Sequence, residues 1–107
     1  MILRSNLLVK FFSFILGMNK LGGIKALAFY PFIITSKNQH LDERTINHEK
    51  IHLRQQIELL VIPFYIWYLI ELYRFGYENI SFEKEAYQND HNFKYLEKRN
   101  LFSFLKY

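Results

Sequence analysis

The 107-residue sequence contains no cysteine, and acidic residues are missing from its first third. Without cysteine there can be no disulfide framework, no cysteine-ligated zinc finger and no cysteine nucleophile, so histidine and carboxylate groups must hold any bound metal. Residues 1–36 carry four basic side chains and no acidic one, whereas residues 37–107 carry ten of each. The whole net charge of +4 therefore comes from the N-terminal part of the chain.

Residues 1–17 are predicted to be a basic, amphipathic segment in which Arg4 and Lys10 lie among leucine, isoleucine and phenylalanine residues. This pattern favours contact with an anionic membrane over nucleic-acid binding, although an ordinary amphipathic helix with its charges in water has the same pattern. Lys10 leaves an apolar run of only Phe11 to Leu16, shorter than the run of about 7–15 residues in a signal peptide. We therefore expect a protein of the cytoplasm or of the cytoplasmic membrane face, bound peripherally.

Only four glycines and two prolines interrupt the chain, and its length suits a single domain spanning residues 1–107. Gly17, Gly22 and Gly23 divide the basic segment from Ile24–Thr35, whose β-branched and aromatic residues predict one strand or a short hairpin. Pro31 cannot donate a hydrogen bond to a sheet, so we expect it at an edge.

Two helices are predicted in the rest of the chain. The first follows a polar loop, has Asp42 or Thr45 as its cap, and continues to about Ile62, with Pro63 introducing a kink. The second runs over residues 82–99, with Ser81 as its cap.

Leu59 to Ile70 carries no charge. As a helix it would extend roughly 18 Å, too little to cross about 30 Å of hydrocarbon. Burial in the core and a position at a membrane interface both remain open for this segment.

The segment His48-Glu49-Lys50-Ile51-His52 carries the clearest chemical signal. Histidines four residues apart on a helix lie on one face, one turn apart, and both can reach a single Zn²⁺. Glu49 is rotated by about 100° from His48, which places its carboxylate where it can take a proton from water instead of binding the ion. The spacing thus predicts two zinc ligands and a general base.

A catalytic zinc needs a third protein ligand and one open position. In the absence of cysteine, the candidates are His40, His91, Glu78, Glu83 and Glu85.

Two segments resemble a known class of zinc peptidases. Residues 48–56, which extend the motif with Gln55 and Gln56, are similar to the HExxHxxQQ helix of several bacterial gluzincin families. Phe82-Glu83-Lys84-Glu85-Ala86 resembles the E-x-x-A-D helix of membrane metalloproteases that process prenylated or misfolded substrates, and the pair of segments resembles a group of short bacterial proteins. The resemblance implies a zincin-like domain that cleaves peptide bonds.

The resemblance also assigns roles on the second helix. It makes Glu83 the third zinc ligand and Ala86 the small residue that lets the two helices approach. Tyr87 stands where those proteases have an aspartate that orients a ligand histidine, and Asp90 lies seven residues after Glu83 on a similar face. In zincins a strand edge beside the site pairs with an extended substrate, a role that the resemblance offers to residues 24–35.

Alternatives remain for three of these positions. Glu85 is the second candidate for the third ligand, because Glu85 and Asn89 reproduce an E-x-x-x-[DN] pattern. Either Tyr87 or His91, which follow Glu83 at one-turn intervals, can serve as a donor to the reacting oxyanion.

We therefore expect a mainly helical α+β domain in which a short β element packs on the motif helix and a third-ligand helix completes the site. The expected function is zinc-dependent peptide hydrolysis, associated with a membrane surface and independent of nucleic acid. The alternative is an inactive, membrane-associated interaction module whose zinc is structural.

Overall fold

The computed structural model describes residues 2–16 and 25–107. Most of these residues are helical, and they include one small sheet of three strands. The prediction of a mainly helical α+β fold is confirmed. Residues 17–24, with the three glycines expected to divide the N-terminal region, lie outside the described part of the chain, as does Met1.

The sheet has the strand order β1-β3-β2. β2 (Ala26–Phe29) and β3 (Phe32–Thr35) form an antiparallel hairpin, and β1 (Ile2–Arg4), which the sequence did not predict, pairs with β3 in parallel. The hairpin alternative for residues 24–35 is therefore correct over its described part. Pro31 lies in the turn of the hairpin, after a cis peptide bond, where no sheet hydrogen bond is needed.

Helix α2 (Glu43–Leu59) carries the histidine motif. Its cap is Asp42, whose carboxylate accepts a hydrogen bond of 2.8 Å from the backbone N–H of Thr45. Of the two predicted capping residues, Asp42 therefore performs this role, because its side-chain oxygen satisfies a backbone donor in the first turn.

The first helix is shorter than predicted, because the chain breaks at Leu60, where φ is +66°. α3 (Val61–Phe75) then leaves at an angle of 112° to α2. Pro63 explains the break: its ring would clash with the carbonyl of Leu59 and it has no N–H to donate in a continuous helix. In the first turn of α3, by contrast, the missing donor costs nothing.

α3 ends at Gly76, whose φ of +85° suits glycine. The short turn η2 (Tyr77–Asn79) leads into α4 (Ser81–Asn89). Ser81 is the first residue of α4 instead of its cap, because the Glu71 carboxylate of α3 accepts hydrogen bonds from its N–H, at 3.0 Å, and from its hydroxyl, at 2.7 Å. A side chain from another helix thus satisfies this helix start.

The predicted helix over residues 82–99 was wrong in its second half. α4 ends at Asn89, and only the short α5 (Tyr95–Lys98) and η3 (Ser103–Lys106) follow. The side-chain amide of Asn47, on α2, donates to the carbonyls of Asp90 at 2.8 Å and Asn92 at 3.1 Å. These bonds take carbonyls that a continuing helix would use itself, so the chain turns.

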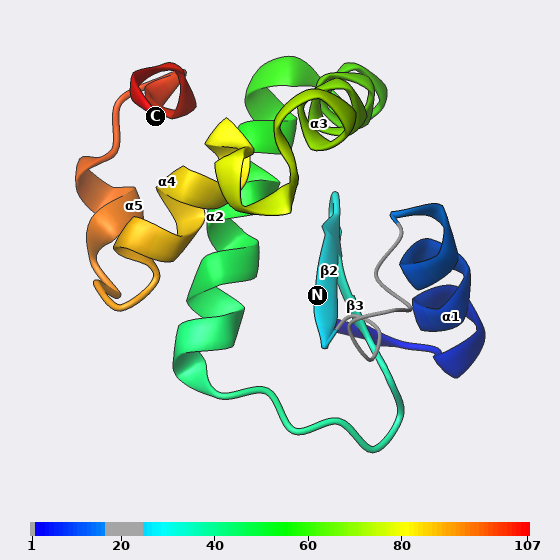
Figure 1. Cartoon of the computed structure of the whole chain (residues 1–107). Helices are drawn as coiled ribbons and strands as arrows, with labels where there is room; N and C mark the ends of the chain where they lie inside the picture. The colour runs from blue at the N-terminus through cyan, green and yellow to red at the C-terminus, as the bar shows by residue number, and fades with distance from the viewer. Residues whose placement is uncertain (1, 17–24) are drawn as a thin grey trace.

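Figure 1 shows the sheet between two helices, with α2 on one side and α1 (Asn6–Ile15) on the other. α3 lies across one end of the sheet, and α4 packs along α2. The core joins these elements through the buried residues Val9, Leu16, Leu27, Ile34, Phe64, Tyr68, Ile80, Phe82 and Phe104. This packing fixes α4 against the face of α2 that carries the motif.

The uncharged segment over residues 59–70 is buried on one side and exposed on the other. Phe64 and Tyr68 are buried, whereas Ile62, Ile66 and Ile70 are each at least half exposed. Among the helices of residues 2–16 and 25–107, none is long and apolar enough to cross a bilayer alone; α2 and α3 meet that test only as a sharply bent pair.

Candidate metal centre

The two histidines of the motif converge on one carboxylate oxygen. Nε2 of His48 lies 3.1 Å and Nε2 of His52 lies 3.0 Å from Oε1 of Glu83, which belongs to α4. All three side chains are buried, and one ligand atom from each lies within 4.8 Å of the others. This group can hold a metal ion. It is the set of three that the motif and the resemblance indicated.

His48 is oriented by a carboxylate from beyond the end of α4. Its Nδ1 lies 3.0 Å from Oδ2 of Asp90, and Arg44 donates from Nε to the other Asp90 oxygen at 2.7 Å. A carboxylate only accepts hydrogen bonds, so Nδ1 donates to Asp90, and Nε2, which is directed at Glu83, is the atom that a metal ion would bind. Asp90 therefore performs the orienting role that Tyr87 cannot.

His52 is oriented by an amide instead of a carboxylate. Its Nδ1 donates to Oε1 of Gln55 at 2.8 Å, one turn along the same helix. Both ligand histidines thus have Nδ1 engaged and Nε2 directed at Glu83. Such partners fix the ring orientation and are typical of metal-binding histidines.

Glu83 binds three partners within the buried group. Besides the two histidines, its second oxygen accepts a hydrogen bond of 2.6 Å from the Tyr68 hydroxyl. Burial works toward a higher pKa for Glu83, but the nearby His52 and His48 outweigh it and hold this pKa well below its ordinary value. The group is therefore ready to bind a cation as an ionised carboxylate.

The pairing with Glu83 also changes the pKa of His52. Burial works toward a lower pKa, but the Glu83 carboxylate overcomes it and raises the pKa of His52 to about 9. In the metal-free protein the proton on His52 thus partly takes the place of a cation beside Glu83.

Glu49 is buried next to this group but bonds to neither histidine. Burial raises the pKa of Glu49 to about 7, although the neighbouring His52 and His48 work against the rise. The nearby backbone of Ala28, in β2, also works against the rise. A carboxyl group with a pKa near neutrality can both take up and release a proton at physiological pH.

A cavity of about 380 Å³ opens onto the three residues and Glu49. β2 forms one wall, and aromatic side chains of α3, η2 and α4 form much of the rest; the lining includes Leu27, Phe64, Tyr65, Tyr68, Tyr77 and Tyr87. The site is thus a partly apolar pocket of the size of small-molecule and peptide-side-chain sites.

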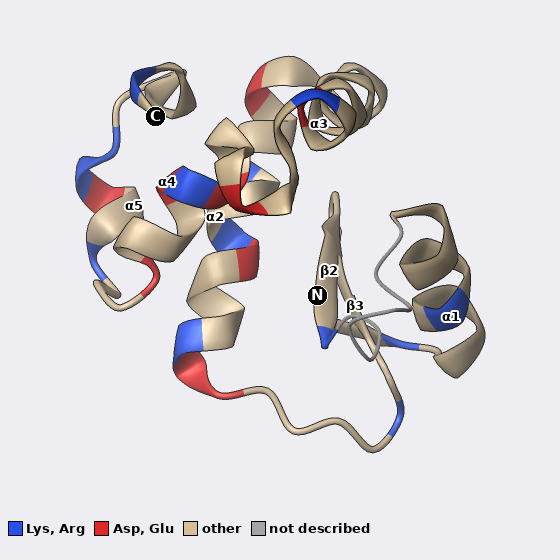
Figure 2. Ribbon diagram, viewed as in Figure 1, with Lys and Arg blue, Asp and Glu red and all other residues tan. Residues whose placement is uncertain are grey.

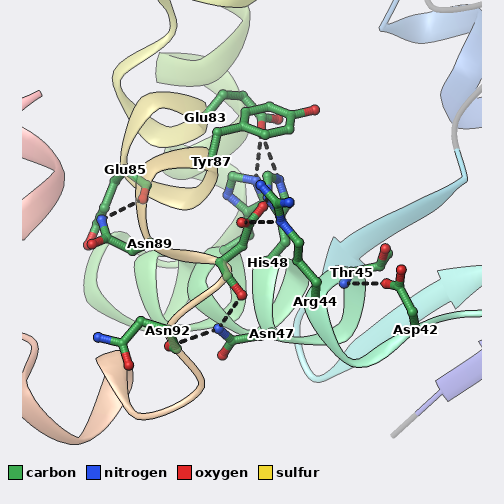
Figure 3. Close-up of polar contacts among 12 residues, drawn as sticks. Asp42, Arg44, Thr45, Asn47, His48, Glu83, Glu85, Tyr87, Asn89 and Asn92 are labelled. Carbon is green, nitrogen blue, oxygen red and sulfur yellow. Dashed lines mark hydrogen bonds and ion pairs between the residues drawn. The ribbon is translucent and has the colours of Figure 1, made fainter.

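Tyr87 lines this cavity, and its ring lies against that of His48 (Figure 3). The two ring centroids are 4.4 Å apart, and the Tyr87 hydroxyl is 2.9 Å from that of Tyr77. Half of Tyr87 is exposed. The hydroxyl therefore does not orient a histidine; Tyr87 is one of the residues that line the cavity.

Two predicted site residues lie elsewhere. Figure 3 shows Glu85 directed away from His48, and its carboxylate binds Arg99, Tyr95 and Gln55. Glu83 and Glu85 are about 200° apart on the helix, so one of them alone can face the histidines. His91 is exposed, because the chain turns after Asn89 and does not carry it along the α4 face. Both assignments are corrected accordingly.

Sequence analysis assigned no role to Gln55 or Tyr68. The signal for Gln55 was available, since it follows His52 by three residues on a helix. Tyr68 reaches Glu83 only because of the sharp break at Leu60, and Pro63 indicated a kink without indicating its direction.

Comparisons of the chain with protein-family models, with curated proteins and with solved structures give no match.

Proposed function

We propose that the protein is a zinc-dependent metallopeptidase in which His48, His52 and Glu83 hold Zn²⁺ and Glu49 is the general base. One observation carries this proposal: two imidazole nitrogens meet one carboxylate oxygen, beside a second carboxyl group that bonds to neither histidine, in an open pocket. A structural zinc site is usually closed by four protein ligands, whereas a catalytic site has three and one open position.

The donor set fits zinc. Two neutral imidazoles and one carboxylate are a known combination for catalytic Zn²⁺. Tetrahedral ligands about 2.0–2.1 Å from zinc lie about 3.3 Å from one another. The Nε2–Oε1 distances of 3.1 and 3.0 Å are close to this separation before any adjustment of the side chains. When bound, the zinc supplies Lewis-acid activation of water and of a substrate carbonyl.

Glu49 accounts for the proton transfers. Its carboxylate accepts a proton from the attacking water and returns it to the amine that leaves when the peptide bond breaks. The raised pKa, about 7, suits both steps at neutral pH. Tyr87, which lines the cavity, is the proposed donor to the oxyanion that develops on the carbonyl.

A peptide is the proposed substrate because of the strand beside the site. β2 is an edge strand, and residues 25–28 line the cavity. An extended peptide can add to such an edge by backbone hydrogen bonds. The carbonyl of Ala28 already accepts from Gln56 and Tyr65, so this pairing is expected at Ala26.

The proposal includes association with a membrane surface. The outer face of α1 exposes Leu7, Phe11, Phe14 and Ile15, and α1 contains one charged residue, Lys10. Figure 2 shows that α1 and most of α3 carry little charge, in contrast to α2 and α4. An apolar face flanked by cations and free of acids suits the interface of an anionic bilayer.

The proposed function is tested by adding the zinc-loaded protein to a library of quenched fluorescent peptides and comparing it with Glu49→Gln. We expect hydrolysis by the wild type and a loss of about 10²–10⁴-fold in the variant. Zinc binding should remain, because Glu49 is not among the three ligands. A zinc-loaded wild type that cleaves nothing would instead favour the interaction module with a structural metal.

A further inference from the structure

The side-chain amide of Gln55 has a fixed orientation. Its Nε2 donates to the backbone carbonyl of Phe82 at 3.1 Å and to Oε1 of Glu85 at 2.9 Å. Both partners only accept hydrogen bonds, so the nitrogen must face them and the oxygen must face His52. This orientation requires the proton of the neutral His52 ring on Nδ1 and leaves Nε2 for the metal.

Glu85 keeps the amide in this orientation because both of its carboxylate oxygens accept hydrogen bonds from fixed donors. Arg99 donates to both oxygens, Tyr95 donates to Oε2, and the Gln55 amide donates to Oε1. With its position fixed in this way, Glu85 offers Gln55 only an acceptor, and the amide cannot turn without losing this bond.

Arg99 neutralises this buried carboxylate and connects it to α2. Its guanidinium donates to Glu85 at 2.5 and 3.1 Å and to Glu58 at 2.6 and 3.1 Å. The side chains of all three are almost fully buried, at 1%, 0% and 2% exposure. Removing Arg99 would leave two buried carboxylates without a cationic partner, so the arginine holds this group together.

We propose that Gln55, Glu85 and Arg99 form a positioning relay that fixes the Nδ1–H form of His52 and thereby sets the affinity of the metal centre. His48 needs no such relay, because Asp90 contacts it directly. The proposal rests on the metal-binding part of the proposed function, and none of the three residues touches the metal or the substrate. Because Arg99 belongs to the relay, the affinity of the metal centre depends in part on the C-terminal segment, beyond α4.

The first test compares two neighbouring glutamines by competition between the protein and a chromogenic zinc chelator. Gln55→Leu should weaken zinc binding about 10–100-fold, as loss of a histidine partner does in other zinc proteins. Gln56→Leu is the matched control, since Gln56 is equally buried but bonds to Ala28 and Tyr30 of the β2–β3 hairpin instead of His52. It should leave the affinity within about threefold. Equal losses in both variants would overturn the relay.

The second test exchanges the two groups that determine the amide orientation. Glu85→Gln provides a donor that lets Gln55 turn, and Gln55→Glu places two carboxylates together; each should weaken zinc binding about tenfold. The double variant Gln55→Glu/Glu85→Gln restores an acceptor facing His52 and a donor facing position 55. It should recover the affinity to within about threefold. Additive losses in the double variant would contradict the proposal.

A readout on the histidine itself separates positioning from general destabilisation. In ¹⁵N-histidine-labelled, zinc-loaded protein, the proton on Nδ1 of His52 should exchange slowly with water in the wild type and in Gln56→Leu. It should exchange faster in Glu85→Gln. Unchanged exchange together with unchanged affinity would overturn the relay while leaving the peptidase proposal intact. If the variants behave as expected but the protein cleaves no peptide, the relay stands and the peptidase proposal is overturned. A wild type that binds no zinc would overturn both the relay and the peptidase proposal.

Discussion

Nδ1 of His48 lies 3.0 Å from Oδ2 of Asp90, a residue just past the end of α4. The peptidases that the sequence resembles have their orienting aspartate earlier, at the position of Tyr87. Here the chain turns after Asn89 and brings the carboxylate of Asp90 back over α2, where Arg44 also binds it. The orienting carboxylate is thus present, although it comes from a different position.

Asp90→Asn should therefore weaken zinc binding about 10–100-fold, because the amide loses the charge that favours a proton on Nδ1 of His48. Chelator competition measures the change. Asp42→Asn is the control, since Asp42 caps α2 and asparagine caps a helix equally well. Equal affinities of the Asp90 variant and the wild type would show that Asp90 does not support the metal site.

The stability of the metal-free protein should fall as the pH rises from about 6.5 to 9. His52 has a pKa raised to about 9, so its stabilising effect is complete below its ordinary value near 6.5 and is lost through the folded-state value. The loss should be on the order of a few kcal/mol at most. Zinc binds the unprotonated nitrogen, so the decline should be absent with zinc bound.

Urea unfolding at pH 6.5 and pH 9.5, with chelator and with zinc, measures this dependence. His52→Gln should abolish the decline in the metal-free protein, whereas His91→Gln, which replaces an exposed histidine, should retain it. A metal-free protein that is equally stable at both pH values would argue against the charged His52–Glu83 pair.

Ala86→Leu should destabilise the fold by about 1–3 kcal/mol, because Ala86 is fully buried on α4, which packs against α2. Displacing α4 should also move Glu83 and weaken zinc binding. Gln88→Leu introduces the same residue at an exposed position of the same helix and should change stability by no more than about 0.5 kcal/mol. Urea unfolding distinguishes them, and similar stabilities would indicate a loosely packed helix pair.

Replacing apolar residues on the outer face of α1 should reduce membrane binding. Leu7 and Phe14 are 76% and 75% exposed, and the double variant Leu7→Glu/Phe14→Glu should bind anionic vesicles at least about tenfold more weakly in a sedimentation assay. Leu101→Glu is the control, because Leu101 is 75% exposed but lies near the C-terminus. A wild type that does not sediment with such vesicles would refute the membrane contact.

Sequence reasoning succeeded where the determining interactions are local. The spacing of His48 and His52 and the cap at Asp42 depend only on helix geometry and neighbouring residues. Pro63 likewise signalled a disruption, although its result is a sharp break at Leu60 instead of a kink within one helix.

The errors concern contacts between distant parts of the chain. The end of α4 depends on Asn47, more than forty positions earlier, so helical periodicity alone extended the helix and placed His91 on the wrong surface. Glu85 fits the sequence pattern of a ligand, but its carboxylate is bound by Arg99, a contact that the pattern does not reveal. Such residues can be assigned only when the packing of α2, α4 and the C-terminal segment is given.

The amount of zinc bound by the wild type, Glu83→Ala and Glu78→Ala tests the central assignment most directly. Glu83 contacts both histidines, whereas Glu78 is an exposed acid five residues earlier that the sequence also offers as a candidate ligand. We predict one zinc per chain in the wild type and in Glu78→Ala, and a loss of tight binding in Glu83→Ala. Undiminished zinc binding by Glu83→Ala, or a wild type that takes up no zinc, would contradict the account.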